Sequence, residues 1–399
     1  MPKLNEVFGI SNDVPEYTYV DRANLDEKFK YLLNTQRHLI IHGASKQGKT
    51  VLRRKNLNEA STISIQCHST TNVQHMYAEI IRKIRIGSPK DERANKILKG
   101  ILGNAENVII GTVTVENAAR NVAELAEEIM LIRKRIVIED FHYLPESEKK
   151  SFALDLKAFW DLGVFFVIVG IWAEQNLLCS YNGDLSGRIE DIDVAWSDIE
   201  LERVLGNGEN ALNVAFESNI RNQMRIDANG NVGLVQRLAE KYCLECSVFE
   251  TSIEPIILDD ITALNRCRQA ICSQESQRYR QFSDAVSRGF EESDLKVYFH
   301  IVRVAIEASD EELMRGLNRK IILERVNRYE AKARLSDLSA ALNRLNRLQQ
   351  NRSISPLVIS FNPESRKLLL VDRELLFYRK YGNPLWPWQE GYTNSPQDD

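Results

Sequence analysis

The chain has 399 residues, of which 43% are hydrophobic and 27% are charged, as is typical of globular domains. Its length suffices for two or three domains, each with an ordinary hydrophobic core. The formal net charge of −4, from 52 basic and 56 acidic side chains, argues against a chain that coats nucleic acid along its whole length. It leaves room for a local basic face.

The sequence gives no sign of a membrane or extracellular location. The N-terminus lacks the apolar run of a secretory signal, and the longest apolar stretch, residues 164–172, is about half of a membrane span. Six cysteines are too few for a disulfide scaffold, so we expect a cytoplasmic protein with no membrane partner. The pairs Cys243–Cys246 and Cys267–Cys272 loosely resemble zinc-ligand spacing, but their helical surroundings favour buried thiols.

From Arg37 to about Val194, short β-rich runs alternate with helical segments, which predicts an α/β domain with a parallel sheet covered by helices. The predicted strands are residues 38–42, 61–66, 107–115, 135–140, 164–170 and 189–194. The predicted helices of this region are residues 73–84, 117–133 and 147–162. A polar, basic segment at residues 87–99 indicates an exposed insertion.

After Trp196 the pattern becomes helical, at residues 198–205, 210–218 and 232–246, as expected for a small lid. Predicted helices at residues 294–308, 310–318 and 335–350 then precede strands at residues 357–361 and 367–371. Three helices followed by a hairpin are typical of a winged helix. We therefore expect four parts: an ATPase core (1–195), a helical lid with linker helices (196–290), a winged-helix domain (291–385) and a tail (386–399) that is disordered beyond Trp388.

One segment carries a phosphate-binding pattern. Gly43-Ala44-Ser45-Lys46-Gln47-Gly48-Lys49-Thr50 matches GxxxxGK[ST] between an apolar strand and a helix-compatible run. The glycines let the backbone turn successive N–H groups toward phosphates, and the following helix adds the positive end of its dipole. Lys49 is expected to reach the β- and γ-phosphates of ATP, and Thr50 to offer its hydroxyl to Mg²⁺.

Two acidic residues, Glu139 and Asp140, end the strand predicted at residues 135–140, one helix downstream of the insertion. In a phosphate-transferring site one such carboxylate holds Mg²⁺, usually through water, and the other polarises the attacking water. The alternative is an acidic pair that is merely solvated. Because Glu precedes Asp here, the reverse of the common order, we assign the two roles to the pair.

Residues 19–238 resemble the AAA+ and STAND group of P-loop ATPases, above all origin-recognition-type initiators and ATPases that regulate transposition. Besides the phosphate loop, four segments carry the resemblance: Tyr19-Val20-Asp21-Arg22, residues 138–144, Val169-Gly170-Ile171-Trp172 and residues 183–189. The first resembles an Arg-containing box near the adenine. The second resembles an acidic strand end followed by an aromatic or His residue, and the third a sensor strand that ends in Gly.

The fourth segment contains Arg188, which the resemblance implies is an arginine finger that completes a neighbouring subunit's site, so that the active form is a homo-oligomer. The alternative is a surface arginine that pairs with Asp191 or Asp193. His142 is open to two interpretations in the same way, as a phosphate sensor or as a structural histidine.

The chain also departs from this family. Gly233 occupies the position where many members place a second-sensor Arg, for which Arg237, one turn later, is a possible substitute. A polar sensor is not obvious after Gly170, although Trp172 and Glu174 stand nearby. Both departures favour a slow switch over a fast motor.

The C-terminal part is locally basic. Residues 315–352 contain ten basic side chains against three acidic ones, which suits a module that meets phosphate backbones. In the helix predicted at residues 335–350, leucines share one face, and a second set of side chains falls largely away from it: Ser339, Asn343, Asn346 and Arg347. Such a helix could read a major groove, or it could belong to a protein-docking or oligomerisation surface. Trp386 and Trp388 are expected to pack onto the last helix.

Together these patterns predict an ATP-binding, slowly ATP-hydrolysing switch whose nucleotide state controls oligomerisation and the engagement of DNA or a partner protein. The alternative is a STAND-like defence or signalling adaptor, which binds ATP to oligomerise and activates a separate effector without binding DNA.

Overall fold

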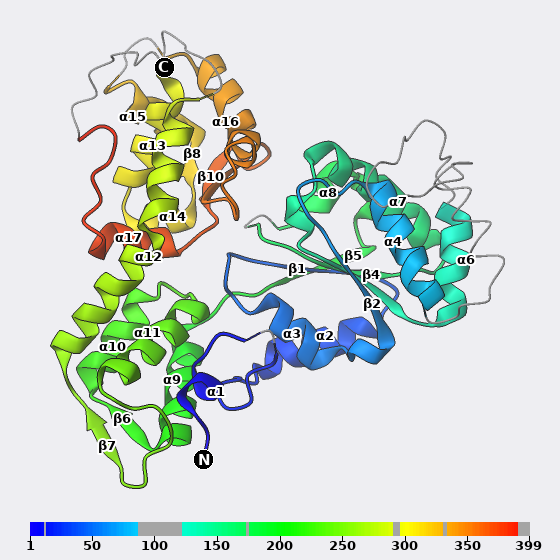
Figure 1. The fold of residues 1–399 in the computed structure, drawn as a ribbon. Coiled ribbons are helices and arrows are strands. Elements are labelled where there is room, and N and C mark those ends of the chain that lie inside the picture. Colours follow the sequence, from blue (N-terminus) through cyan, green and yellow to red (C-terminus); the bar gives the residue numbers. More distant parts are fainter. Residues whose placement is uncertain (12, 87–121, 173–174, 290–295, 330–332, 390–399) are drawn as a thin grey trace. The chain divides into compact units, whose positions relative to one another are not determined.

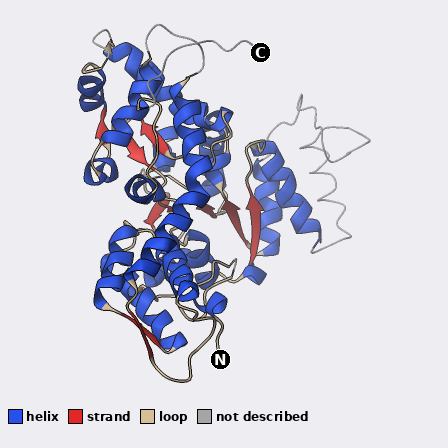
Figure 2. Cartoon of the chain, turned by 60° about the vertical axis from the view of Figure 1, so that its left-hand side comes forward, coloured by secondary structure: helices blue, strands red, loops and turns tan. Residues whose placement is uncertain are grey.

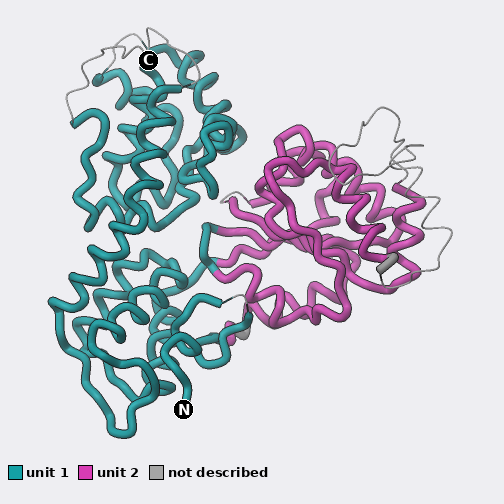
Figure 3. The backbone as a smooth tube through the Cα atoms, viewed as in Figure 1, with its two compact units in different colours: residues 1–20, 44–47, 195–399 teal, residues 21–43, 48–194 magenta. Residues whose placement is uncertain are grey.

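The computed structural model describes residues 1–11, 13–86, 122–172, 175–289, 296–329 and 333–389. It divides into two compact units, which Figure 3 draws in different colours. We call residues 21–43 and 48–194 the sheet unit, and residues 1–20, 44–47 and 195–399 the helical unit. The insertion predicted at residues 87–99, the strand predicted at residues 107–115 and most of the predicted tail lie outside the described residues.

Among its described residues, the sheet unit contains five strands in the order β2-β3-β4-β1-β5, and every neighbouring pair is parallel. The strands are β1 (His38–His42), β2 (Thr62–Gln66), β3 (Arg135–Glu139), β4 (Phe166–Val169) and β5 (Ile189–Asp193). The α-helices are α2 (Ala23–Leu33), α3 (Lys49–Asn56), α4 (Val73–Ile86), α6 (Val122–Ile132), α7 (Glu146–Asp161) and α8 (Leu177–Tyr181). Three short 3₁₀ helices join them: η1 (Glu59–Ser61), η2 (Phe141–Tyr143) and η3 (Gly183–Leu185). These strands confirm the predicted parallel-sheet core.

Helices cover both faces of this sheet (Figure 1). Because successive strand side chains point to opposite faces, Ile40 of β1 joins the core beneath α4, α6 and α7, whereas Leu39 and Ile41 join the core beneath α2 and α3. All five residues of β1 are buried. Burial on both sides explains why the inner strands β3 and β4 contain continuous apolar runs in the sequence.

The helical unit is mainly helix with a few short strands (Figure 2). Its first part contains α1 (Leu4–Val7), α9 (Asp198–Leu212), β6 (Val214–Phe216), α10 (Ser218–Asp227), α11 (Val232–Glu245), β7 (Ile256–Leu258) and α12 (Ile261–Ser287). Strands β6 and β7 pair in parallel. We call α9, α10 and α11 the lid.

The prediction of separate helices at residues 198–205 and 210–218 is wrong. A single helix, α9, begins at a capping box made by Ser197 and Glu200 and continues to Leu212, and a strand follows it. The Gly-Asn-Gly sequence at 206–208 resembles a turn, but a Cβ at Gly208 would lie 2.0 Å from the ring of Phe8. The glycine therefore allows the N-terminal segment to pack closely against an unbroken helix.

The last part, residues 296–389, we call the C-terminal module. Its elements are α13 (Val297–Glu307), α14 (Asp310–Arg315), β8 (Leu317–Asn318), α15 (Arg319–Val326), α16 (Leu335–Asn351), β9 (Ile359–Asn362), β10 (Lys367–Leu370) and α17 (Glu374–Tyr381). The three strands form an antiparallel sheet in the order β8-β10-β9. The helices and strands predicted here are confirmed as α13, α14, α16, β9 and β10, whereas β8, α15 and α17 were not predicted.

Side chains whose role the sequence left open are packed inside the helical unit. Cys243, Cys267 and Cys272 are buried in its apolar core, and burial raises the pKa of each thiol. Trp386 is buried against Tyr378, which confirms its predicted packing role. Within the part of the chain that the structure describes, no helix has the length and apolarity needed to cross a bilayer.

The sheet unit also contains a buried titratable side chain, His38, which lies outside the phosphate-binding motif. His38 bridges two elements: its Nε2 lies 2.9 Å from the Leu156 carbonyl oxygen, and its Nδ1 accepts the Phe166 N–H at 3.1 Å. Accepting at Nδ1 requires the neutral ring. Burial lowers the pKa of His38 to about 4, and the nearby Arg135 acts in the same direction.

We expect a His38→Gln variant to lose less stability in acid than the wild-type protein. With a native pKa of about 4 against 6.5 in the unfolded chain, the unfolded state takes up a proton first, so the free energy of unfolding falls as the pH drops below 6.5. Between pH 7.5 and pH 5 the wild type should lose about 2 kcal/mol more than the variant. Urea denaturation at both pH values measures this difference, and equal losses would contradict it.

Candidate functional site

The segment that follows β1 has the backbone of a phosphate-binding loop. Gly43, Lys46 and Gly48 have positive φ angles of 140°, 59° and 74°, and Gly48 is the N-cap of α3. Alternation of right- and left-handed residues turns neighbouring N–H groups toward one point, where an anion can bind. The loop also opens onto the N-terminus of α3, whose dipole favours negative charge.

Lys49 starts α3 and is buried, and its Nζ donates to the Gly43 carbonyl oxygen at 3.2 Å. Burial lowers the pKa of Lys49 to about 8, an effect that the carboxylates of Asp140, Asp193 and Glu139 partly offset. These three carboxylates act on a buried cation at the start of α3, and the role of Lys49 in binding phosphates stays a prediction.

Glu139 and Asp140 lie at the carboxyl end of β3 but have different surroundings. Glu139 is buried, and its Oε2 accepts a hydrogen bond from Thr50 Oγ1 at 3.4 Å. Asp140 is part-exposed, has a left-handed φ of 54°, and accepts a hydrogen bond from Gln66 Nε2. Burial raises the pKa of both carboxyl groups. The structure therefore places Glu139 in contact with Thr50, whereas Asp140 contacts Gln66.

The predicted Mg²⁺ ligands fit such an ion. Thr50 Oγ1 and Glu139 Oε2 are oxygen donors that face each other across 3.4 Å, and Mg²⁺ prefers oxygen ligands. Asp140, the third predicted ligand, directly follows Glu139 in the sequence.

The middle of the loop, residues 44–47, belongs to the helical unit and contacts the C-terminal module. The Ser45 N–H donates to the Val371 carbonyl oxygen at 3.2 Å. Lys46 Nζ forms an ion pair of 2.7 Å with Glu374 Oε2, and the Glu374 side chain is only 2% exposed. Burial raises the pKa of Glu374, an effect that Lys46 opposes. Two successive loop residues are thus bound by residues more than 300 positions away in the chain.

The lid holds the same part of the loop from another direction. Gln47 Nε2 donates to the Gly230 carbonyl oxygen at 2.9 Å, and Trp196 Nε1 donates to the Gln47 carbonyl oxygen at 2.9 Å. The Gly233 N–H donates to the Lys46 carbonyl oxygen at 3.2 Å. Lys46 is therefore fixed in its left-handed conformation by contacts at both its backbone and its side chain.

The absence of a second-sensor Arg at position 233 has a structural reason. A Cβ at Gly233 would lie 3.0 Å from Lys46 Cβ and 3.2 Å from its carbonyl oxygen, so a large side chain would displace the loop. Arg237 pairs with Glu275 Oε1 at 2.8 Å and lies 3.6 Å from Glu374 Oε2. In this structure Arg237 therefore neutralises acidic side chains of the helical unit.

His142 and Trp172, two candidate sensors, are both buried. The pKa of His142 is lowered to about 3, mainly by burial and further by Lys149 and Lys49, so its ring is neutral and is not a cationic phosphate ligand. Its Nδ1 lies 3.9 Å from Asp140 Oδ1. Trp172 stacks on His42, with ring centroids 5.8 Å apart. Glu174 lies outside the described residues.

Arg188 lies at the edge of the sheet opposite to the loop. It precedes β5, whose residue Ile189 pairs with His38 at the start of β1, and the loop follows the end of β1. Its guanidinium lies 4.7 Å from the centre of the Trp160 ring and donates to the Asp184 carbonyl oxygen. Arg188 is therefore separated from the Lys49 site of its own chain, and its role across a subunit boundary stays a prediction.

The predicted adenine-side box, residues 19–22, ends at Arg22, a buried residue at the N-cap of α2 whose N–H donates to Asp26 Oδ2 at 3.0 Å. Its role beside adenine also stays a prediction.

Sequence reasoning missed three residues of the site. Arg53 contacts Glu139, Gln66 contacts Asp140, and Glu374 contacts Lys46. Two of them had a signal: Arg53 is four residues after Lys49, hence on the same helix face, and Gln66 ends a strand that neighbours β3. Glu374 had none.

Comparison with known proteins agrees with this geometry. Residues 32–174 match the family model described as "AAA domain". The chain therefore contains an AAA domain, and the predicted resemblance to the AAA+ group of P-loop ATPases is confirmed. The match covers residues 32–174 and identifies an ATPase domain of this type in that part of the chain. No curated protein matches the sequence.

Three solved structures show the range of similarity. A Walker-type ATPase of Pyrococcus abyssi is 16% identical, with a TM-score of 0.53 over 94% of this chain and 99% of that one. The Orc1 protein of Aeropyrum pernix, solved in complex with DNA, is 11% identical, with a TM-score of 0.47 over 96% and 97%. A STAND protein of Pyrococcus horikoshii is 12% identical, with a TM-score of 0.40 over 91% of this chain and 42% of that one. The first supports the same fold.

Replacing Lys49 by Ala should strongly weaken nucleotide binding. Loss of a buried, charged hydrogen-bond donor to phosphate is expected to weaken ATP affinity by about 100-fold. Titration with a fluorescent ATP analogue measures the change, with Lys55→Ala, an exposed lysine on the same helix, as the control. Binding or ATP turnover that persists in the Lys49→Ala protein would refute the site.

Proposed function

We propose that this protein is a switch that binds ATP with Mg²⁺, hydrolyses it slowly, and couples its nucleotide state to oligomerisation and to the engagement of DNA by the C-terminal module. The observation that carries the proposal is the direct attachment of the phosphate loop to this module, through Ser45 to Val371 and through Lys46 to Glu374.

The two attachments and a bound phosphate compete for the same region. The module presents a carbonyl oxygen and a buried carboxylate to the loop, and both are negatively polarised. A triphosphate bound by the loop would need the Ser45 N–H and the Lys46 ammonium, the two groups that the module occupies. Nucleotide binding and attachment of the module therefore oppose each other, and each weakens the other by the same factor.

The site residues then take separate roles. Lys49 binds the phosphates, and Thr50 and Glu139 hold Mg²⁺, which would neutralise charge on the phosphate oxygens. Asp140, held by Gln66, polarises the attacking water. An Asp side chain is one methylene shorter than the Glu more common in this role. Together with Gly233 in place of an Arg, this supports slow turnover, as expected of a switch.

We further propose that the C-terminal module is a winged helix. Helices α13, α15 and α16 precede the β9–β10 hairpin, and β8 completes its sheet, which is the order of that motif. On α16, the second helix after β8, Asn343, Arg344 and Arg347 are exposed. Their chemistry suits phosphates and base edges, so this face is the proposed DNA contact.

Two residues of the helix face that was predicted to contact DNA make hydrogen bonds within the module instead. Ser339 Oγ accepts a hydrogen bond from Arg319 Nη1 at 2.9 Å. Asn346 donates to Ser360 Oγ at 3.0 Å and accepts the Phe361 N–H at 3.3 Å. They bind α16 to its own module, which leaves a narrower contact face than the sequence suggested.

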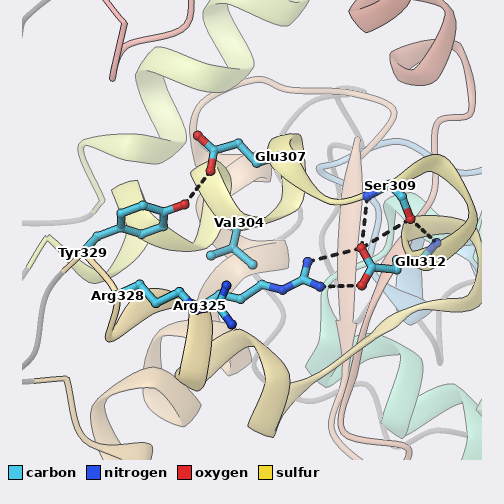
Figure 4. Close-up of a pocket in the computed structure, with 7 residues that line it drawn as sticks. All are labelled: Val304, Glu307, Ser309, Glu312, Arg325, Arg328 and Tyr329. Atoms are coloured by element: carbon cyan, nitrogen blue, oxygen red, sulfur yellow. Dashed lines mark hydrogen bonds and ion pairs between the residues drawn. The ribbon is translucent and has the colours of Figure 1, made fainter.

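The C-terminal module is also less basic than the composition of residues 315–352 indicates. Arg315, Arg325 and Arg328 pair with Glu311, Glu312 and Glu324, and two of these acids precede the window. Figure 4 shows the pocket of about 410 Å³ beside them, where Arg325 binds Glu312 and Tyr329 binds Glu307. Because these polar groups satisfy one another, we assign no ligand there. The pairing supports the alternative function, an adaptor whose C-terminal module binds a protein.

Replacing Glu374 by Gln tests the switch. The variant loses the ion pair with Lys46, so ATP affinity should rise about 5-fold or more, the lower end of typical coupling between sites. Hydrogen exchange at residues 371–381 should rise when ATP and Mg²⁺ are added to the wild type, and should be high in Glu374→Gln from the start. Glu275→Gln, which removes the partner of Arg237 instead, is the control. Exchange that is the same with and without ATP would exclude the coupling.

Salt titration separates the two functions. If the exposed face of α16 binds DNA, affinity should fall steeply with salt, and replacing Arg344 and Arg347 by Gln should reduce the slope of log affinity against log salt by about 2. Replacing Arg203 and Arg266 of α9 and α12 by Gln removes the same charge outside the module. An absence of DNA binding even at low salt would favour the adaptor.

A further inference from the structure

One arginine in the sheet unit is buried without a role in the predicted machinery. Arg53, on α3, is 1% exposed, although arginine is rarely buried unless its charge is paired. It follows Lys49 by four residues and so faces the same side of the helix, toward the end of β3.

The guanidinium of Arg53 contacts Glu139 in a specific way. Its Nε and Nη2 lie 3.0 and 2.8 Å from the same carboxylate oxygen, Oε1. Its Nη1 donates to Glu59 Oε1 at 2.6 Å. Two donors thus converge on one oxygen of Glu139, and the other oxygen, Oε2, faces Thr50 Oγ1 at 3.4 Å.

This arrangement decides which oxygen of Glu139 is available. A glutamate side chain can rotate about its terminal bond, which would exchange its two oxygens. The planar, always charged guanidinium restrains that rotation, because its rigid fork binds one carboxylate oxygen with two N–H groups.

We propose that Arg53 is a positioning residue for the metal site: it orients Glu139 so that Oε2 faces the hydroxyl of Thr50 and the divalent cation of the nucleotide. This inference rests on the proposed ATP and Mg²⁺ site and adds to it a residue outside the motif. Arg53 itself binds neither phosphate nor metal.

The contact with Glu59 is the competing explanation, since it could make Arg53 only a structural bridge to η1. The Glu59 side chain is 56% exposed, and exposed ion pairs stabilise proteins little. Glu139 is the buried partner, with its side chain 8% exposed. Loss of Arg53 would therefore affect mainly Glu139, whose buried carboxylate would lose its partner.

The test measures ATP affinity twice, once with Mg²⁺ and once with EDTA, and takes the ratio as the metal enhancement. Arg53→Gln should reduce this enhancement by about 10- to 100-fold, the usual effect of losing a group that orients a metal ligand. Affinity in EDTA should stay within about 3-fold of wild type, because the phosphate contacts of Lys49 remain. Electron paramagnetic resonance should show weaker Mn²⁺ binding to the ATP-loaded variant.

Three further variants make the result specific. Arg54→Gln removes a neighbouring charge that also contacts Glu59, and should keep the full enhancement. Glu59→Gln should also keep it; if it reproduces the effect of Arg53→Gln, the bridging explanation holds instead. Arg53→Lys keeps the charge but not the fork, and should give an intermediate enhancement even if Arg53→Gln does not fold.

A full metal enhancement in folded Arg53→Gln, or in Arg53→Lys where the former does not fold, would overturn the inference. Failure of the proposed function is distinguishable from this result. It appears in the wild-type protein, as absence of ATP binding or of any metal enhancement.

Discussion

A parallel sheet delivers the last residue of every strand to one edge, and the candidate site depends on this constraint. β1 leads into the phosphate loop, β2 ends at Gln66, and β3 ends at Glu139. At the end of β5, Asp193 lies close to Gly43, where a Cβ would be 3.4 Å from its Oδ1. The strand order alone therefore brings together residues that are far apart in the sequence.

The candidate site brings charges of both signs together. Lys49 and Arg53 provide buried cations, and Glu139, Asp140 and Asp193 provide the carboxylates that offset them. Burial of either kind alone would be costly, so the two kinds stabilise each other.

Local chemistry explains which parts of this site the sequence could predict. The phosphate loop and the Glu139–Asp140 pair are contiguous motifs, so their residue types alone identify them. Arg53 and Gln66 required one further step, from helix spacing and from strand order. Glu374 could not be predicted, because it is 328 residues from Lys46 and nothing in its own sequence marks the contact.

The same distinction holds for the fold and for the charges. The buried strands of the sheet are apolar runs that sequence identifies, whereas the unbroken helix α9 depends on Phe8, almost 200 residues earlier. The basic window at residues 315–352 overstated the charge of the C-terminal module, since a window counts residues along the chain. Arg315 and Arg325 are neutralised by Glu311 and Glu312, which lie just before it.

Helix α12, with 27 residues, is about 40 Å long and packs both on α11 of the lid and on α13, α16 and α17 of the C-terminal module. One continuous helix thus connects the two groups that hold residues 45–47. Since a helix resists bending far more than a loop does, we expect these two groups to move together. A rotation of about 10° at one end would displace the other by about 7 Å. A change the size of a phosphate group can thereby become a displacement the size of a helix radius or more.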